Sequence, residues 1–188
     1  MIKAVVFDCD GTLVDSEPHS WAAWKTVLGG YGVEITDEQI SQCTGLGYHD
    51  TYTFVAALSD AELPAPEPLL EELLAALGAS YERGLRRFDD AVGAVADLAF
   101  EGIPLAVASS SHRARLDLTL GAADLARYFD ISVAGDEVAG GKPRPDVYLR
   151  AAELLGTKPG NCVAVEDSGP GAQAGIAAGM RVIGVGRR

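Results

Sequence analysis

Two aspartates near the start of the chain are separated by a single residue, and both follow a short apolar run. The run occupies residues 4–7, and the aspartates are Asp8 and Asp10. Carboxylates this close together repel each other unless a positive charge lies between them. Such a pair can bind a metal ion, attack an electrophile or exchange protons. Because Gly11 follows Asp10, an ordinary acidic turn is the alternative interpretation.

Three later apolar runs are also followed by polar side chains. The runs occupy residues 103–108, 131–134 and 163–165, and the polar residues that follow are, in chain order, Ser109 and Ser110, then Lys142, then Glu166 and Asp167. The carboxyl ends of parallel strands meet at one edge of a sheet, so these side chains are expected to share a pocket. Each group alone has an ordinary alternative. The serines could form a turn or a helix cap, Lys142 could be a solvated charge, and Glu166 and Asp167 could begin a helix.

The combination of four carboxylates, a lysine and a hydroxyl suggests phosphoryl chemistry. Oxygen ligands favour Mg²⁺, and a metal ion together with the ammonium of Lys142 would make a site for an anion such as phosphate. With the phosphoryl charge neutralised, Asp8 could attack in line. Asp10 could protonate the leaving oxygen and then deprotonate the attacking water. Ser109 could donate a hydrogen bond to the transferring group.

The pattern of elements predicts how these residues are positioned. Apolar runs alternate with helical patterns from residue 89 onward, with a fifth strand at residues 182–185, so we expect an α/β fold with a doubly wound, mostly parallel, Rossmann-like sheet. Residues 16–88 carry helical patterns at 37–43, 49–59 and about 69–85, after a first helix capped by Asp15 or Ser16. We therefore predict a catalytic core of residues 1–15 and 89–188 and a small α-helical cap of residues 16–88.

The first helix of this segment carries both tryptophans of the chain, Trp21 and Trp24, at helical spacing. We expect them to pack in a core rather than to stack on a ligand. Near the other end of the segment, Arg83, Arg86 and Arg87 could bind a second phosphate, but three arginines on a long helix are more often a solvated face.

Composition narrows the class of protein. The chain has 188 residues, 48% of them hydrophobic, with a mean hydropathy of +0.12 and a formal net charge of −12. A packed core is expected, and a nucleic-acid partner is not, because no basic stripe is present. No apolar run approaches membrane-spanning length, and the start of the chain lacks a signal-peptide pattern. Three widely spaced cysteines fit a reducing cytoplasm, whereas the oligomeric state is not predictable from the sequence.

Four motifs, in order, resemble those of the haloacid dehalogenase superfamily, in its phosphatase and β-phosphoglucomutase-like branch. The motifs span residues 8–17, 107–111, 141–146 and 166–168. The resemblance implies that Asp8 is the nucleophile that forms an aspartyl-phosphate and that Asp10 is the general acid/base. It also implies a set of ligands for Mg²⁺ and for the phosphoryl group. The metal ligands are Asp8, the backbone carbonyl of Asp10, Asp167 and, directly or in the outer shell, Glu166; the phosphoryl ligands are Ser109, Ser110 and Lys142.

The resemblance favours one function and leaves two alternatives open. We expect a Mg²⁺-dependent phosphatase that acts on a small phosphorylated metabolite, such as a sugar phosphate. Asp10 favours phosphoryl chemistry over carbon–halogen cleavage, because dehalogenases lack this second acid. The first alternative is a β-phosphoglucomutase-like transfer to a sugar; against it, Ser20 and Tyr48 replace a histidine and a substrate-gripping arginine of the mutases. The second is a binding protein without catalysis, since Asp89 and Asp90 replace the usual Pro-Gly of the cap hinge.

Overall fold

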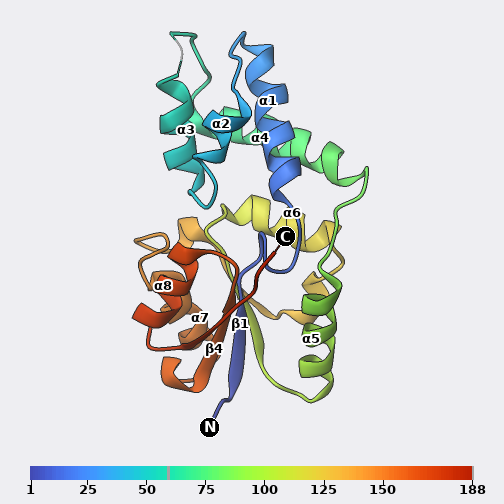
Figure 1. Ribbon diagram of the computed structural model, residues 1–188, viewed down its shortest axis with the longest axis vertical. Helices are drawn as coiled ribbons and strands as arrows, with labels where there is room; N and C mark the ends of the chain where they lie inside the picture. Colours follow the sequence, from blue (N-terminus) through green and yellow to red (C-terminus); the bar gives the residue numbers. More distant parts are fainter. Residues whose placement is uncertain (59, 188) are drawn as a thin grey trace.

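The computed structural model describes residues 1–58 and 60–187, and a five-stranded parallel sheet forms its centre (Figure 1). The strand order is β3-β2-β1-β4-β5. The predicted doubly wound α/β sheet is therefore confirmed, and all five predicted strands are present. Their bounds are β1 Ala4–Phe7, β2 Leu105–Ala108, β3 Ile131–Val133, β4 Cys162–Glu166 and β5 Arg181–Gly184.

Strand β1 lies in the middle of the sheet, as its unbroken apolar run predicts. All four of its residues are buried, and Val6 is paired with Ala106 of β2 on one side and Ala164 of β4 on the other. The chain builds the sheet first on the β2 side of β1 and later on the β4 side. Ligands of open α/β sheets bind beyond the carboxyl ends of the strands at such a reversal. Asp8 and Asp10 follow β1 at this point.

Helices cover both faces of the sheet (Figure 1). Helices α5 (Asp89–Phe100) and α6 (Arg113–Ala122) cover one face, where Phe7 and Leu116 belong to the core. Helices α7 (Asp146–Leu154) and α8 (Gly169–Ala177) cover the other face. A Cβ atom at Gly175 of α8 would lie 2.8 Å from Val182 Cγ2, so the small residues of α8 allow the close packing expected from the sequence.

In the described part of the chain between β1 and α5, four helices form a separate layer above the carboxyl ends of the strands (Figure 1). They are α1 (Glu17–Gly30), α2 (Asp37–Ser41), α3 (Tyr48–Ala56) and α4 (Pro66–Tyr81). We call this layer the helical segment. It has a hydrophobic core of its own, which includes Trp24 of α1, Val55 of α3 and Leu69 of α4. Helix α4 ends at Tyr81 instead of continuing through Leu85, and Gly84 (φ +118°) has a backbone conformation unsuited to a helix.

The chain enters and leaves the helical segment along two adjacent stretches. Val14 and Arg87 form an antiparallel bridge, the Asp15 amide donates to the Arg86 carbonyl at 2.9 Å, and the Phe88 amide donates to the Leu13 carbonyl at 3.0 Å.

The acidic pair Asp89 and Asp90, expected at a hinge, lies instead in the first turn of α5. Negative charge at that end complements the helix dipole, so the pair has a structural role there. None of the described helices is both long enough and apolar enough to cross a membrane.

Candidate active site

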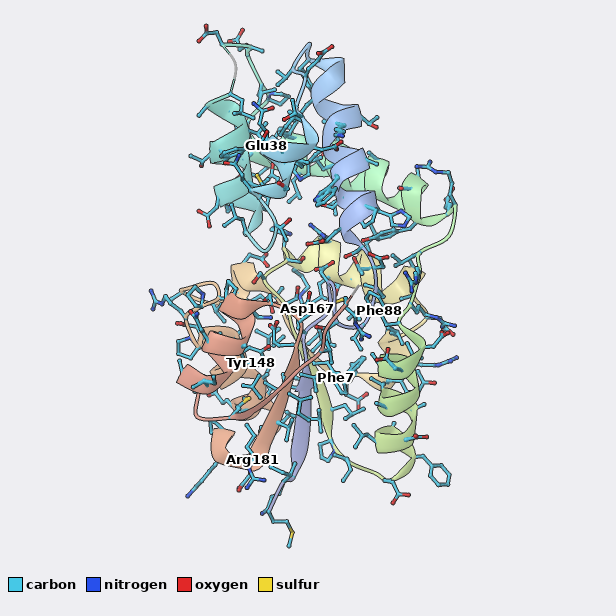
Figure 2. All side chains as sticks on the ribbon, in the orientation of Figure 1. Phe7, Glu38, Phe88, Tyr148, Asp167 and Arg181 are labelled. Carbon is cyan, nitrogen blue, oxygen red and sulfur yellow. The ribbon has the colours of Figure 1, made fainter. Side chains whose placement is uncertain are left out.

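The loop after β1 brings its first aspartate under the helical segment and close to the end of β4. The Asp8 amide donates to the Val165 carbonyl at 2.9 Å. Gly11 has φ +82°, and a Cβ atom there would lie 2.2 Å from Asp167 Oδ2, so only glycine fits. The Thr12 hydroxyl donates to Asp167 Oδ1 at 3.2 Å. In Figure 2, Asp167 lies at the upper end of the sheet, toward the helical segment, whereas Phe7 lies lower, within the core.

Lys142 joins the ends of three strands through one ammonium group. Its Nζ atom donates to Asp8 Oδ1 at 2.6 Å, to Glu166 Oε1 at 2.5 Å and to the Ala108 carbonyl at 3.0 Å. The side chain is only 4% exposed. Burial lowers the pKa of Lys142, but the two carboxylates outweigh burial and raise the pKa above its usual value. The ammonium therefore stays charged and offsets part of the negative charge of the site.

Glu166 lies behind Lys142, without reaching the cavity surface. The Tyr148 hydroxyl donates to Glu166 Oε1 at 2.8 Å, and the Ser168 amide and hydroxyl donate to Oε2 at 3.2 and 3.0 Å. Gly171 makes room, because a Cβ atom there would lie 1.8 Å from Oε1. Burial raises the pKa of Glu166, but Lys142 outweighs burial and the pKa falls below its usual value. Glu166 is therefore held ionised in a fixed position.

The ionised forms of the Asp8 and Asp167 carboxyls, unlike that of Glu166, are disfavoured. Burial raises the pKa of Asp8 to about 7, although Lys142 opposes the rise, and Glu166 adds to it. Burial and the charge of Glu166 also raise the pKa of Asp167. Burial is the largest cause of both shifts, and Lys142 opposes each of them only in part.

These three carboxylates fit a magnesium ion. Asp8, Glu166 and Asp167 each offer an oxygen atom, and the three atoms lie within 4.8 Å of one another. An all-oxygen donor set with excess negative charge is the kind that binds Mg²⁺. The carboxylate of Asp10 is not in this group. The assignment of Asp10 to the metal depends on its backbone carbonyl and stays a prediction.

Asp10 points instead toward helices α1 and α6. It accepts hydrogen bonds from the hydroxyls of Ser16 and Ser111, the latter at 2.7 Å, and pairs with Arg115 Nη2 at 3.2 Å. Burial raises the pKa of Asp10, but Arg115 and the two hydroxyls outweigh burial and leave the pKa below its usual value. Ser16 occupies the predicted N-cap position of α1, but its side chain makes no hydrogen bond to the helix backbone. Its hydroxyl donates to Asp10 instead.

The loop after β2 carries the predicted phosphoryl-binding serines. Ser109 is buried, and its Oγ accepts from the Ser111 amide at 3.0 Å, which leaves its hydroxyl hydrogen free to donate. The Ser110 carbonyl packs against the backbone of Gly135, where a Cβ atom would lie only 2.4 Å away. Both serines line the same cavity as Lys142.

Three residues of the site were not predicted from the sequence: Ser111, Arg115 and Tyr148. Ser111 and Arg115 are four residues apart, near the amino-terminal end of α6, and both reach Asp10. Their spacing gave no usable signal, because Ser111 precedes the N-cap of α6 and the two residues do not share a helix face. Tyr148 gave no signal, because a tyrosine on an apolar helix face is usually a core residue.

A cavity of about 240 Å³ lies between the strand ends and the helical segment. All predicted site residues except Glu166 line it: Asp8, Asp10, Ser109, Ser110, Lys142 and Asp167. Trp24 is 6% exposed and packs in the core of the helical segment, as predicted. However, Trp24 and Trp21 also line the cavity, so both tryptophans face the space where a ligand would bind.

Comparison with known proteins places the chain in one family. Residues 5–185 match the family of haloacid dehalogenase-like hydrolases. The chain belongs to this family, and to its branch of phosphatases and β-phosphoglucomutases, as the four motifs predicted. This membership supports an enzyme of phosphoryl chemistry, either a phosphatase or a phosphotransferase.

Individual relatives show how far the likeness extends. The protein SUPPRESSOR OF QUENCHING 1 of Arabidopsis thaliana is 36% identical over 98% of this chain, which spans only 18% of that relative's length. The fructose-1-phosphate phosphatase YqaB of Escherichia coli is 33% identical, over 96% of this chain and 95% of its own. Among solved structures, CbbY of Rhodobacter sphaeroides in complex with phosphate has a TM-score of 0.91 at 26% identity, covering 100% of this chain and 88% of that chain.

Proposed function

We propose that this protein is a Mg²⁺-dependent phosphatase that hydrolyses a small phosphorylated metabolite, such as a sugar phosphate, through an aspartyl-phosphate on Asp8. The observation that carries the proposal is the placement of Asp8. It lies at the cavity surface, 2.6 Å from Lys142 and within reach of Asp167. If the pair of Asp8 and Lys142 were only a structural salt bridge, it would not need Asp167, a further carboxylate without a cation of its own among the described residues, beside it.

In the first proposed step, a carboxylate oxygen of Asp8 attacks phosphorus as the bond to the ester oxygen breaks. Lys142 and the free hydroxyl hydrogen of Ser109 hold the phosphoryl oxygens. Asp10 gives its proton to the leaving alcohol. The negative phosphoryl group favours this protonated form, because a like charge nearby raises the pKa of a carboxyl.

In the second step, water attacks the phosphorus of the aspartyl-phosphate and the bond to Asp8 breaks. Asp10 takes the proton from that water, and inorganic phosphate leaves. Arg115, Ser16 and Ser111 favour the ionised form of Asp10, which is the form that this step requires.

Asp8, Asp167 and the backbone carbonyl of Asp10 would hold Mg²⁺, with Glu166 fixed by Lys142 and Tyr148 as a further or outer ligand. When bound, the metal neutralises phosphoryl charge so that an anionic nucleophile can approach. We further propose that the helical segment acts as a cap. It would open at the paired stretches 13–15 and 86–88 and close to exclude water.

A β-phosphoglucomutase-like reaction is the alternative within this family. That reaction must hold a second phosphate away from Asp8. The three arginines considered for that task do not line the cavity: Arg83 donates within α4, Arg86 pairs with Asp15, and Arg87 donates to the Ala123 carbonyl. Their positions favour hydrolysis.

The test is phosphate release from a panel of sugar phosphates and an aryl phosphate, with Mg²⁺ and with EDTA. Release should require Mg²⁺, and Asp8→Asn should lower kcat by at least about a thousandfold, because it removes the nucleophile. Asp97→Asn, on α5 away from the cavity, is the matched control and should keep normal activity. Substantial release by Asp8→Asn, or unchanged release in EDTA, would contradict the proposal.

A further inference from the structure

The helical segment contributes a wall of apolar and neutral polar side chains to the active-site cavity, and its hydroxyl groups belong to Ser20, Thr44 and Thr51. Trp21 and Trp24 of α1, Ile40 of α2 and Leu46 of the following loop all line it. Trp24 is stacked on Tyr48, with ring centroids 6.1 Å apart and an interplanar angle of 21°. A neighbouring cavity of about 50 Å³ shares Trp24 and Leu46 with the first and continues toward the leucines of α4. The part of a substrate that extends from the phosphoryl group therefore meets aromatic and apolar surface interspersed with hydroxyl groups.

Among the described residues that line the main cavity, the helical segment supplies only one charged side chain, and it is a carboxylate. This residue is Glu17, in the first turn of α1. Burial raises its pKa, and the charges of Asp167 and Asp10 add to the rise. Glu17 thus lies where the potential is already negative. A second anionic group on the substrate would be repelled by this wall and would find no lysine or arginine on it.

Of the described residues, two core cations line the cavity, and carboxylates already engage both. Lys142 pairs with Asp8 and Glu166, where the transferring phosphoryl group would bind. Arg115 pairs with Asp10 and also donates to the Ser20 hydroxyl at 3.3 Å. The Nε atom of Arg115, which has no hydrogen-bond partner among the described residues, is buried, so a second anion at Arg115 would compete with Asp10 and Ser20 for the two Nη atoms and weaken the pairing of Asp10.

We infer that the substrate is a monophosphate ester whose alcohol part has no second anionic group and rests an apolar face against Trp21, Trp24 and Leu46. This inference rests on the proposed function and narrows it. It admits neutral sugars and other uncharged alcohols with an apolar face. It excludes sugar bisphosphates and phosphorylated sugar acids as preferred substrates.

Two pairs of esters test the inference because each pair differs by one anionic group. Fructose 1-phosphate is compared with fructose 1,6-bisphosphate, and glucose 6-phosphate with 6-phosphogluconate. We call the ester whose alcohol part carries no charge the neutral member of its pair. Its kcat/KM should be at least about tenfold higher than that of the charged member, the size expected for one uncompensated charge at a partly buried site. Equal values, or a preference for the charged member in either pair, would overturn the inference and leave the phosphatase proposal intact.

Variants in the wall separate charge from shape. Glu17→Gln should reduce the preference for the neutral member at least about threefold, and Leu46→Lys should reduce it further, because each makes the wall less negative. Leu154→Lys is the matched control: Leu154 is 44% exposed, like Leu46, but lies at the end of α7 and lines none of the described cavities. An unchanged preference in both wall variants would contradict the role assigned to this wall.

Binding measurements test the inference without requiring hydrolysis of any ester. Both tryptophans of the chain line the cavity, so intrinsic tryptophan fluorescence reports its occupancy. With Asp8→Asn and Mg²⁺, the neutral member of each pair should bind more tightly. Tighter binding of the charged member would overturn the inference even if no ester were hydrolysed, whereas absence of hydrolysis with every ester would count against the proposed function alone.

Discussion

Single residues set the chemistry of this site through the charges beside them. Asp8 and Asp10 are two positions apart, yet burial raises the pKa of Asp8 to about 7, whereas Arg115 and two hydroxyls overcome burial and lower the pKa of Asp10. Neighbouring carboxyls thereby acquire different proton affinities, set by burial and by the charges and hydroxyls beside them.

Tyr148 offers a test of how the site is held together. Tyr148→Phe should remove the 2.8 Å hydrogen bond to Glu166 while keeping the ring, which lies 5.0 Å from Lys142 Nζ. We expect a loss of about 1 kcal/mol in the free energy of unfolding, typical of one buried hydrogen bond. The Mg²⁺ concentration for half-maximal activity should rise several-fold, by analogy with other residues that orient metal ligands.

Tyr52→Phe is the control for this variant. The Tyr52 hydroxyl donates to the Pro64 carbonyl at 2.9 Å within the helical segment. It should lose similar stability in urea unfolding with no change in Mg²⁺ dependence. If both variants left the Mg²⁺ dependence unchanged, Tyr148 would have no role in positioning the metal ligands.

At the scale of elements, loops at strand ends are tied down by charged pairs outside the cavity. Arg113, at the start of α6, donates to Glu137 Oε1 at 3.0 Å and Oε2 at 2.6 Å, and to the Ser132 carbonyl of β3 at 2.9 Å. Glu137 also accepts from the Ala134 amide at 2.9 Å. These bonds hold α6 against the loop after β3. Because the serines that follow β2 lead into α6, they are held in place as well.

The Glu137 pair predicts a pH-dependent contribution to stability. Hydrogen bonds from Arg113 lower the pKa of Glu137 below its usual value. The contribution is therefore present above the ordinary carboxyl pKa and is lost as pH falls through the lowered folded-state pKa. Glu137 is 43% exposed, so solvent screens the pair, and Glu137→Gln should cost only about 0.5–1 kcal/mol in urea unfolding at pH 7.

The difference in unfolding free energy between this variant and the wild type should shrink as pH falls through the folded-state pKa of Glu137. Glu153→Gln is the control, because Glu153 is 70% exposed and pairs only with its helix neighbour Arg150. A Glu137 effect that stayed constant down to the lowest pH at which the protein folds would show that packing, not charge, supplies this contribution.

The elements themselves were predictable because their signals are local. The apolar run of residues 4–7 specified β1, and each of the other four predicted strands lies within two residues of its observed bounds. Helix α4 was predicted too long, since its leucine spacing continues to Leu85 while the backbone at Gly84 turns away. Similarly, Asp89 and Asp90 were assigned to a hinge because they replace the usual Pro-Gly there, although their place in the first turn of α5 follows from ordinary dipole complementarity.

The site was less predictable because its contacts join distant parts of the chain. The sequence placed the acids, serines and lysine at strand ends, and the structure gathers them around one cavity. It did not reveal that Arg115 of α6 pairs with Asp10, 105 positions away, or that Glu166 lies behind Lys142. Both depend on side-chain direction in the assembled molecule, which spacing along a chain does not specify.

On the scale of the whole molecule, polar contacts join the helical segment to helix α6. One is buried: the Tyr81 hydroxyl of α4 lies 3.0 Å from the hydroxyl of Thr119 on α6, which itself donates to the Arg115 carbonyl at 2.8 Å. Another is the hydrogen bond from Arg115 to Ser20. Both contacts involve α6, so α6 links the helical segment to the residues around Asp10.

Breaking the buried contact should loosen the helical segment. Thr119→Val leaves the Tyr81 hydroxyl without its partner, and we expect a loss of about 1–3 kcal/mol in urea unfolding. Amide exchange should become faster in α4. Thr26→Val is the control, because Thr26 donates only to the Ala22 carbonyl on an exposed face of α1. Unchanged exchange in α4 would mean that this contact does not hold the segment against the core.

The covalent phosphoryl-enzyme is the central claim, and trapping it is the most direct test. The enzyme would be mixed with a hydrolysed phosphate ester and Mg²⁺, quenched in acid within milliseconds, and digested for mass spectrometry. We predict one added phosphoryl group on the peptide that contains Asp8, and none in Asp8→Asn. Rapid turnover with no adduct, or an adduct on another residue, would contradict the assignment of Asp8 as the nucleophile.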